Sequence, residues 1–389
     1  MDNLTLAQQL RHLVIFKNLR TEPLMAALAT ALESGDTAGV CDLAAELYPR
    51  GMNLRQAVST LLLQDDNFCV RDAAALRPLP RQAADWLERE LALLEEAVCA
   101  TAELQSPNLP AWELDGEPLA AVYQKMLRDA PCLGYGIFSQ YHVFSVSPEG
   151  TLIPIEHPDP QQLSELYGYE AERQKLLQNT RALLQGLPAN NVLLYGDAGT
   201  GKSSTVKALV NEYKDQGLRL IQVEKSRLRH IPALLDSLSA NPLKFILFID
   251  DLSFAADDHD YTALKTVLEG SVAARSSNTV VYATSNRRHL IQETFQSRQG
   301  DEIHISDTLE EVSSLSARFG IVITFGRPDK DLYLSVMEKL AERAGLALED
   351  SLYKEAEAYA LRAGGRSPRV ARQYVEYKVA MDCNSSCAK

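Results

Sequence analysis

Long hydrophobic runs are absent from this sequence of 389 residues. No stretch approaches the roughly 18 consecutive apolar residues that a membrane-spanning helix needs, which excludes an integral membrane protein. Cysteine is scarce too: there are six residues, and no pair has CxxC spacing. This excludes a disulfide-rich miniprotein and favours free thiols in a reducing compartment. Residues 1–16 lack a charged segment followed by an apolar core, so we expect no secretory signal and a cytoplasmic location.

An excess of basic residues is also missing. The chain carries 39 Lys and Arg against 52 Asp and Glu, a formal net charge of −13. Residues 1–135 hold 11 basic and 19 acidic residues, whereas residues 136–389 hold 28 and 33. Phosphate backbones are bound by concentrated Lys and Arg, so a general nucleic-acid coat is disfavoured. The acidic N-terminal third favours a basic or apolar protein surface as partner.

The residues that are present predict an ordered chain of two or three domains. Hydrophobic residues make up 46% and charged residues 23%, close to soluble globular proteins. Residues 1–135 read as an all-α N-terminal domain, because apolar residues recur at three- and four-residue spacing. Proline-containing breaks separate several of the expected helices, at 24–34, 37–48, 55–63, 83–104 and 119–130.

The pattern changes at residue 136. Residues 136–138, 141–146 and 151–155 are rich in β-branched and aromatic side chains, and Pro148 to Gly150 reads as a turn. We therefore expect a short β-hairpin followed by a linker, together covering residues 136–160.

Strands and helices alternate over residues 161–327, which predicts an α/β domain with a parallel sheet covered on both faces. The expected strands are 191–195, 218–223, 245–249, 279–283 and 321–325, and the expected helices are 169–185, 202–213, 231–238 and 261–268. Residues 328–389 read as a helical lid that is broken once, at residues 363–365.

The strongest motif follows the first of these strands and matches G-x-x-x-x-G-K-[ST] in full, the P-loop or Walker A pattern. Glycines let such a loop point backbone N–H groups inward, where they and the helix N-terminus hold phosphates. Lys202 is expected to reach the β- and γ-phosphates of ATP, and the Ser203 hydroxyl to bind Mg²⁺. The expected binding residues are Gly196, Asp197, Ala198, Gly199, Thr200, Gly201, Lys202, Ser203 and Ser204.

A second motif is the buried strand 245–249, which ends in Asp250 and Asp251. Downstream of a P-loop, an acid at this point holds Mg²⁺ and constitutes a Walker B motif. We expect Asp250 to take that role. We expect Asp251 to orient or activate the attacking water.

With these two motifs, residues 166–389 resemble the AAA+ ATPases. The chain is most similar to a group of uncharacterised bacterial AAA+ proteins that carry Asp-Asp-Leu-Ser-Phe and Tyr-Ala-Thr-Ser-Asn-Arg-Arg-His-Leu. Both motifs are present in this sequence, at residues 250–254 and 282–290. The resemblance implies a P-loop sheet with a C-terminal helical lid, ATP and Mg²⁺ as ligands, and homo-oligomers. It does not imply a particular client.

The resemblance implies three further catalytic residues. Asn286 stands at the sensor 1 position, which contacts the γ-phosphate or the attacking water; alternatively it caps a turn. Arg318 stands in the box that supplies an arginine finger to the neighbouring subunit; alternatively it forms a surface ion pair. Arg369 stands in the sensor 2 motif of the lid; alternatively it faces solvent at a helix start. Tyr167 or Tyr169 is expected either to pack on the adenine or to belong to the core.

One departure from the family pattern concerns turnover. Most active AAA+ proteins pair Asp with Glu at this strand end, and Asp251 is one methylene shorter. ATP binding is therefore better supported than fast hydrolysis, and two functions follow. The first is an ATPase that remodels a partner recognised by the N-terminal domain, and the second is a nucleotide-gated scaffold with negligible turnover.

A third hypothesis is a helicase-loader-like nucleic-acid factor. It rests on fold-level analogy and on two basic stretches. Lys225, Arg227, Arg229 and His230 form one, which also reads as a solvated helix start, and Arg287 and Arg288 form the other.

Overall fold

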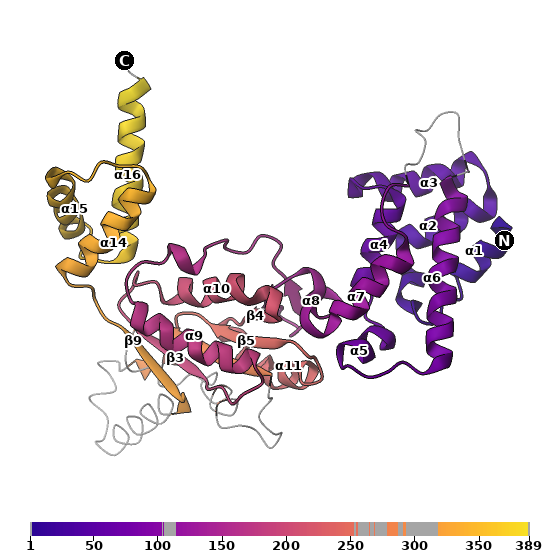
Figure 1. Ribbon diagram of the computed structural model, residues 1–389, viewed down its shortest axis with the longest axis horizontal. Coiled ribbons are helices and arrows are strands. Elements are labelled where there is room, and N and C mark those ends of the chain that lie inside the picture. The colour runs from indigo at the N-terminus through magenta and orange to yellow at the C-terminus, as the bar shows by residue number, and fades with distance from the viewer. Residues whose placement is uncertain are drawn as a thin grey trace. The chain divides into compact units, whose positions relative to one another are not determined.

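In a computed structural model, the structure describes residues 2–102, 104, 114–252, 254, 255, 264, 268, 278–286, 291, 292 and 318–387. The chain divides into two units, Met1–Tyr141 with Asn241–Leu243, and His142–Ala240 with Lys244–Lys389. The first unit is helical and the second contains the sheet with its surrounding helices (Figure 1).

The helical unit confirms the all-α character predicted for the N-terminal region. Its helices are α1 (Asn3–Leu10), α2 (Pro23–Ser34), α3 (Thr37–Leu47), α4 (Leu54–Gln64), α5 (Phe68–Ala74), α6 (Arg81–Ala102), α7 (Leu119–Leu133) and α8 (Ile137–Gln140), with the 3-10 turns η1 (Lys17–Thr21) and η2 (Tyr48–Arg50). Local sequence starts several of them: Asn53 caps α4 in a reciprocal capping box with Gln56. Phe16 and Tyr123 meet edge to face at 5.1 Å in the shared core.

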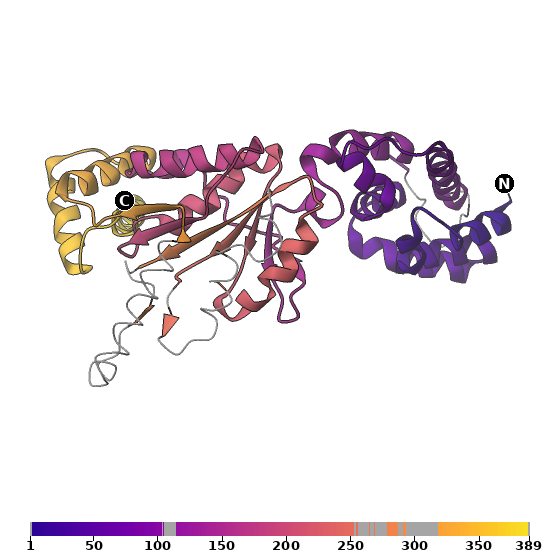
Figure 2. The ribbon, with the colours of Figure 1, turned by 90° about the horizontal axis from the view of Figure 1, so that it is seen from below.

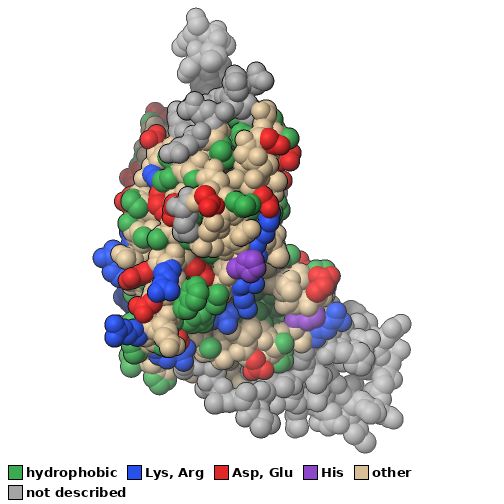
Figure 3. Space-filling view, turned by 90° about the vertical axis from the view of Figure 1, so that its right-hand side faces the viewer, with side chains coloured by type: hydrophobic (Ala, Val, Ile, Leu, Met, Phe, Trp, Pro, Cys, Tyr) green, Lys and Arg blue, Asp and Glu red, His purple; other side chains and the backbone are tan. Residues whose placement is uncertain are grey.

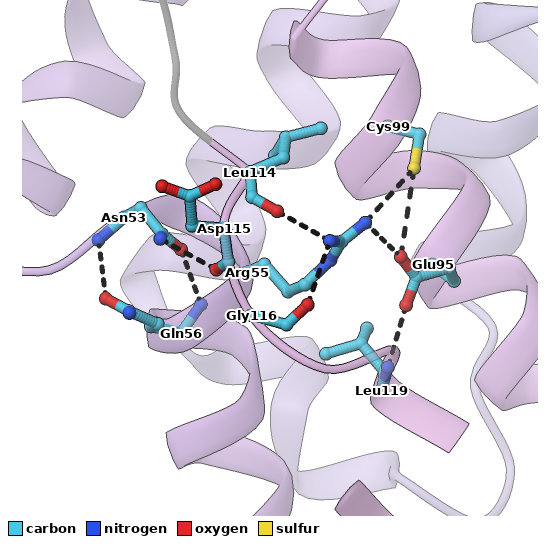
Figure 4. A network of polar contacts seen from close by, with 9 residues as sticks. All are labelled: Asn53, Arg55, Gln56, Glu95, Cys99, Leu114, Asp115, Gly116 and Leu119. Carbon is cyan, nitrogen blue, oxygen red and sulfur yellow. Dashed lines mark hydrogen bonds and ion pairs between the residues drawn. The ribbon is translucent and has the colours of Figure 1, made fainter. Parts of the chain in front are cut away.

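A polar network centred on Arg55 joins α4, α6 and the segment before α7 (Figure 4). The Arg55 guanidinium donates to Glu95 at 2.6 Å and to the Leu114 carbonyl at 2.5 Å. The other Glu95 oxygen accepts from the N–H of Leu119, which is the first residue of α7, at 2.8 Å. Both side chains are half-buried, 16% exposed for Arg55 and 25% for Glu95, so water and salt screen this ion pair less than one at the surface.

We expect Arg55→Ala to destabilise the helical unit by about 2 kcal/mol, since it leaves Glu95 without its cation and the Leu114 and Gly116 carbonyls without their donor. Denaturant unfolding followed by circular dichroism measures this change. Arg81→Ala, at an exposed position that starts α6, is the matched control. Equal unfolding midpoints for the two variants would contradict a structural role for the network.

The expected hairpin forms, but its first part was predicted wrongly. Residues 137–140 make the helical turn α8, and the strands are β1 (Val143–Val146) and β2 (Leu152–Pro154), paired antiparallel. The reason is local: Gly136 adopts a positive φ of 58°, and the Ser139 hydroxyl donates to the Gly136 carbonyl at 2.8 Å. These features close a turn that the β-branched composition did not reveal.

The second unit contains a seven-stranded sheet of order β2-β1-β4-β5-β7-β3-β9. Its parallel strands include β3 (Val192–Gly196), β4 (Leu218–Gln222), β5 (Lys244–Ile249), β7 (Thr279–Ser285) and β9 (Ile321–Phe325), and β1 joins them by pairing parallel with β4. A separate pair, β6 (Phe254–Ala255) and β8 (Ile291–Gln292), lies outside this sheet. The sheet confirms the predicted α/β fold class.

Helices cover both faces of the sheet. Apolar side chains of α9 (Glu170–Leu184) and α10 (Lys202–Tyr213) pack in one core with alternate residues of the strands. Helix α11 (Ile231–Leu238) lies on the opposite face (Figure 2). Short 3-10 turns complete the unit at η3 (Leu163–Glu165), η4 (Lys214–Gln216) and η5 (Lys225–His230). The expected helix at 261–268 lies mostly outside the described residues.

The C-terminal helices form a lid with a core of its own. They are α14 (Lys330–Arg343), α15 (Asp350–Arg362) and α16 (Pro368–Cys387). Tyr333, Met337 and Tyr374 are buried between them. One break was predicted, at residues 363–365, but a second occurs at Gly345, whose φ of 74° ends α14. Among the helices of the described ranges, none combines the length and apolar character needed to cross a membrane.

Candidate nucleotide-binding site

The order of the strands brings the predicted motifs to one edge of the sheet. Strands β5, β7 and β3 are neighbours, with Ile249 paired to Ala283 and Tyr195 paired to Ser285. Asp250 and Asn286 follow directly after β5 and β7. Because parallel strands end at the same edge, these side chains and the P-loop that follows β3 share one crevice.

Glycines permit the observed path of the P-loop. Gly196 has a φ of 141°, and a Cβ there would lie 1.9 Å from the Phe325 carbonyl oxygen. Gly199 and Gly201 have φ of 78° and 93°, and Gly201 immediately precedes α10. The first N–H groups of α10 have no intrahelical acceptor, so they provide donors for an anion at the mouth of the loop.

Lys202 turns its amine into this loop. Its Nζ donates to the carbonyls of Gly196 at 2.7 Å and Asp197 at 2.8 Å, and to Asn286 Oδ1 at 3.1 Å. Burial lowers the pKa of the amine, while the carboxylates of Asp197 and neighbouring acids raise it in part. A bound anion would raise the pKa of the Lys202 amine further, as expected for a loop that receives negative charge.

Three oxygen atoms, from two hydroxyls and one carboxylate, meet beside Lys202. The Ser203 hydroxyl donates to Asp250 Oδ1 at 2.5 Å, and the Thr284 hydroxyl donates to the same oxygen at 2.6 Å. Within the described ranges, no three His, Cys, Asp or Glu side chains are grouped to hold a metal by themselves. One carboxylate and one hydroxyl fit Mg²⁺, which commonly keeps its water and takes phosphate oxygens for the remaining positions.

Asp251 is held in an unusual backbone conformation. Its φ is 51°, a left-handed value that is uncommon outside glycine. The Asp251 N–H donates to Thr284 Oγ1 at 2.9 Å, and its carboxylate accepts from Asn286 Nδ2 at 2.7 Å. Asn286 therefore bridges Lys202 and Asp251, which is an arrangement that fixes the acid and the cation relative to each other.

The lid reaches the P-loop through the start of α16. The Arg369 N–H donates to the Gly199 carbonyl at 3.2 Å. A Cβ at Gly199 would approach Ser367 Oγ and Arg369 Cβ to 3.1 Å, so glycine also permits this close packing. Together the loop, the strand ends and α16 enclose a cavity of about 410 Å³.

Most of the predicted site residues line this cavity: Ala198, Gly199, Thr200, Gly201, Lys202, Ser203, Ser204, Asp250, Asp251, Asn286 and Arg369. Gly196 and Asp197 contribute the carbonyls that Lys202 contacts. Arg318, a described and half-buried residue just before β9, does not line it.

Sequence reasoning missed five lining residues, Gln161, Leu166, Thr284, Pro368 and Arg372. Arg372 stands three residues after Arg369, so the helical period was a signal that could have found it. Thr284 precedes Asn286 by two positions on a strand, which places it on the same side. Gln161 lies in the irregular segment between β2 and η3, where no periodic pattern applies.

The two tyrosines considered for adenine differ in environment. Tyr169 is buried in the core beneath the sheet face, and its hydroxyl donates to the Gly326 carbonyl at 2.6 Å. Tyr167 instead packs against the lid and lines a small cavity of about 30 Å³ together with Leu166 and Pro368. Tyr169 is thus a core residue, whereas Tyr167 is half-buried beside the lid and does not line the main cavity.

The basic run 225–230 forms the short turn η5, and His230 contacts the Pro148 carbonyl at 3.1 Å. Arg287 and Arg288 lie outside the described residues. Of the described residues 225–230, none lines the cavity.

A protein-family model described as "Protein of unknown function (DUF815)" matches residues 139–381. Among curated proteins, the human outer mitochondrial transmembrane helix translocase is 26% identical over 198 residues, covering 46% of this chain and 52% of the relative. The chain thus spans about half the length of that relative. The replication factor C large subunit of Staphylothermus marinus is 30% identical over 122 residues, or 28% of each chain.

Among solved structures, the Thermotoga maritima RuvB Holliday junction branch migration motor is similar at 19% identity and a TM-score of 0.37. The match covers 56% of this chain and 63% of that one.

Proposed function

The chain belongs to the DUF815 family, and we propose that it is a Mg²⁺-dependent AAA+ ATPase that couples its nucleotide state to remodelling of a partner protein. The single observation that carries this proposal is the cavity in which a complete P-loop, two carboxylates, Asn286 and a lid arginine converge. Its proposed location is the cytoplasm.

In this proposal the P-loop holds ATP through backbone N–H groups at the start of α10, while Lys202 exchanges loop carbonyls for phosphate oxygens. Ser203 and Asp250 would hold Mg²⁺, which when bound neutralises charge that develops on the phosphates. Thr284 keeps the Asp250 carboxylate oriented through its 2.6 Å bond. The chain's own groups thus bind and position the phosphates.

Hydrolysis would depend on Asp251 and Asn286. Asp251 is the acid available to orient the attacking water, and its bond to Asn286 sets the direction of its carboxylate. Arg369 lies on the lid side of the cavity, where a guanidinium stabilises negative charge on the transferred group. Because the Arg369 backbone also contacts Gly199, loss of the γ-phosphate would be transmitted to the lid.

The proposed partner is a protein client bound by the N-terminal helices. Basic, acidic and hydrophobic side chains are interspersed on the face in Figure 3, which offers no surface of one sign alone. The likeness to a transmembrane helix translocase agrees with a protein client, whereas the likeness to a replication factor C subunit does not. The excess of acidic residues in 1–135, 19 against 11 basic, favours the protein client. Phosphate release that stays unchanged on adding single- or double-stranded DNA would agree with that choice.

We further propose that the chain forms homo-oligomers in which Arg318 completes a neighbour's site. Arg318→Ala should lower phosphate release per subunit at least about tenfold without weakening ATP binding. Mixing Arg318→Ala subunits, which retain an intact P-loop, with Lys202→Ala subunits, which retain Arg318, should restore part of the rate. A mixture as inactive as its components would contradict a role between subunits.

The alternative function is a nucleotide-gated scaffold with negligible turnover. The shorter Asp251 in place of Glu, held by Asn286, favours it. Phosphate release measured across a range of protein concentrations separates the two functions. A rate per subunit that rises with concentration supports an oligomeric enzyme, and saturable ATP binding without release supports the scaffold.

A further inference from the structure

A small cavity of about 30 Å³ adjoins the nucleotide cavity, and its lining includes both apolar lid side chains and the charged residues Glu165 and Arg173. The small cavity beside it shares Leu166, Thr200, Gly201, Pro368 and Arg372 with the main one. Val336 and Leu340 of the lid line only the small cavity, whereas Asp250, Asn286 and Arg369 line only the main one. Arg372 therefore stands at the seam between the two cavities, on the side of the nucleotide cavity that lies away from Asp250 and Asn286.

Gln161 holds Arg372 at this seam. With its amide oriented so that both ends are satisfied, the Gln161 oxygen accepts from the Arg372 guanidinium at 2.6 and 3.3 Å. The Gln161 nitrogen donates to Ser204 Oγ at 3.1 Å. Since Ser204 accepts this bond, its hydroxyl proton remains available to a ligand oxygen.

The Gln161 side chain is itself rigidly placed. The residue is only 7% exposed. Its carbonyl accepts from Asn211 Nδ2 at 2.8 Å, and its N–H donates to Asp159 at 3.1 Å. The same Asn211 amide also donates to the Asp159 carbonyl at 2.8 Å. The linker is thus fastened to α10, so Gln161 presents a fixed acceptor to the lid arginine.

We propose that Arg372 and Ser204 bind the phosphate next to the ribose, the α-phosphate, and that Gln161 is the positioning residue for both. This inference rests on the proposed function. Lys202, Asp250 and Asn286 serve the distal end of the triphosphate, while this trio serves the end adjoining the base. ATP and ADP share the α-phosphate, so the contact contributes equally to both nucleotides.

The test is isothermal titration calorimetry with Mg²⁺, using ADP and the non-hydrolysable β,γ-imido analogue of ATP. Arg372→Ala should weaken both nucleotides by the same factor of about ten, because one charge-assisted bond is lost from each. Gln161→Ala should weaken both about threefold. Gln161→Glu should match Arg372→Ala, because its carboxylate neutralises the guanidinium and cannot donate to Ser204.

Arg362→Ala, at an exposed lid arginine that lines neither cavity, is the matched control and should bind both nucleotides like the wild type. Its unfolding temperature without nucleotide should equal that of Arg372→Ala. An Arg372→Ala variant that binds ADP normally would overturn the inference, as would one that loses affinity for the ATP analogue alone. Those failures differ from failure of the proposed function, in which the wild type itself binds neither nucleotide.

Discussion

Lys202→Ala should weaken ATP binding at least about 100-fold. The side chain is the one P-loop cation among the lining residues of the cavity, and it is partly desolvated there, so its charge acts on phosphates with little screening. Binding energy from two phosphates is lost together, which is why the expected effect exceeds that of a single surface contact. Calorimetric titration with ATP and Mg²⁺ measures it.

Lys207→Ala is the matched control for this change. Lys207 is a lysine on the same helix α10, and it does not line the cavity. We expect ATP affinity within about twofold of the wild type for that variant, since a charge that does not line the cavity contributes little. If Lys202→Ala kept the ATP affinity of the wild type, the proposal that the P-loop binds ATP would be wrong.

Asp251→Asn should lower phosphate release by about 10²-fold to 10⁴-fold while leaving ATP affinity nearly unchanged. The amide keeps the shape and an acceptor for Asn286 but loses the charge that orients and activates water. Asp250→Asn should instead reduce both the rate and the dependence on Mg²⁺, because Asp250 accepts from Ser203 and is the proposed metal ligand. Steady-state phosphate release over a Mg²⁺ titration distinguishes the two variants.

Asp236→Asn on α11 provides the control, since this exposed carboxylate lies outside the cavity. Its rate should equal that of the wild type. If Asp251→Asn released phosphate at the wild-type rate, the role given to Asp251 would be wrong, and another group would have to orient the water. That result would not support the scaffold function, because hydrolysis would still occur. If no variant and not even the wild type released phosphate, the scaffold would be the better account.

The sequence could predict those parts of the site whose residues are contiguous in the chain or directly follow an apolar strand. The P-loop is contiguous, and Asp250 and Asn286 stand directly after apolar strands, so the topology of a parallel sheet places them together. The structure brings these residues into one cavity with Arg369, while their chemical roles stay predictions.

Gln161 and Thr284 could not be assigned in advance because their roles depend on tertiary contacts. Gln161 lies 43 positions before Ser204 and 211 before Arg372 in sequence, and it meets both only when the linker is fastened to α10. Thr284 becomes informative only when β7 lies beside β5, where its hydroxyl contacts Asp250. No periodicity or local motif reports such contacts.

In the fold, too, repeated local patterns could be predicted from the sequence, whereas short features could not. Long amphipathic helices and apolar strands were predicted to within a few residues, since their periodicity is repeated over many positions. The errors fall on short features. The expected ranges did not include the helices α1 and α5. Two further errors, which a single residue decides, are α8 after Gly136 and the break at Gly345. In both places a positive φ at glycine, which composition does not specify, ends or redirects the chain.

Phosphate release from ATP by the purified wild-type chain, compared with Lys202→Ala in the same preparation, tests the central claim most directly. We predict Mg²⁺-dependent release by the wild type, a rate per subunit that rises with protein concentration, and none above background for the variant. Equal release by the two proteins would contradict hydrolysis at this cavity, and release without Mg²⁺ would contradict the role given to Ser203 and Asp250.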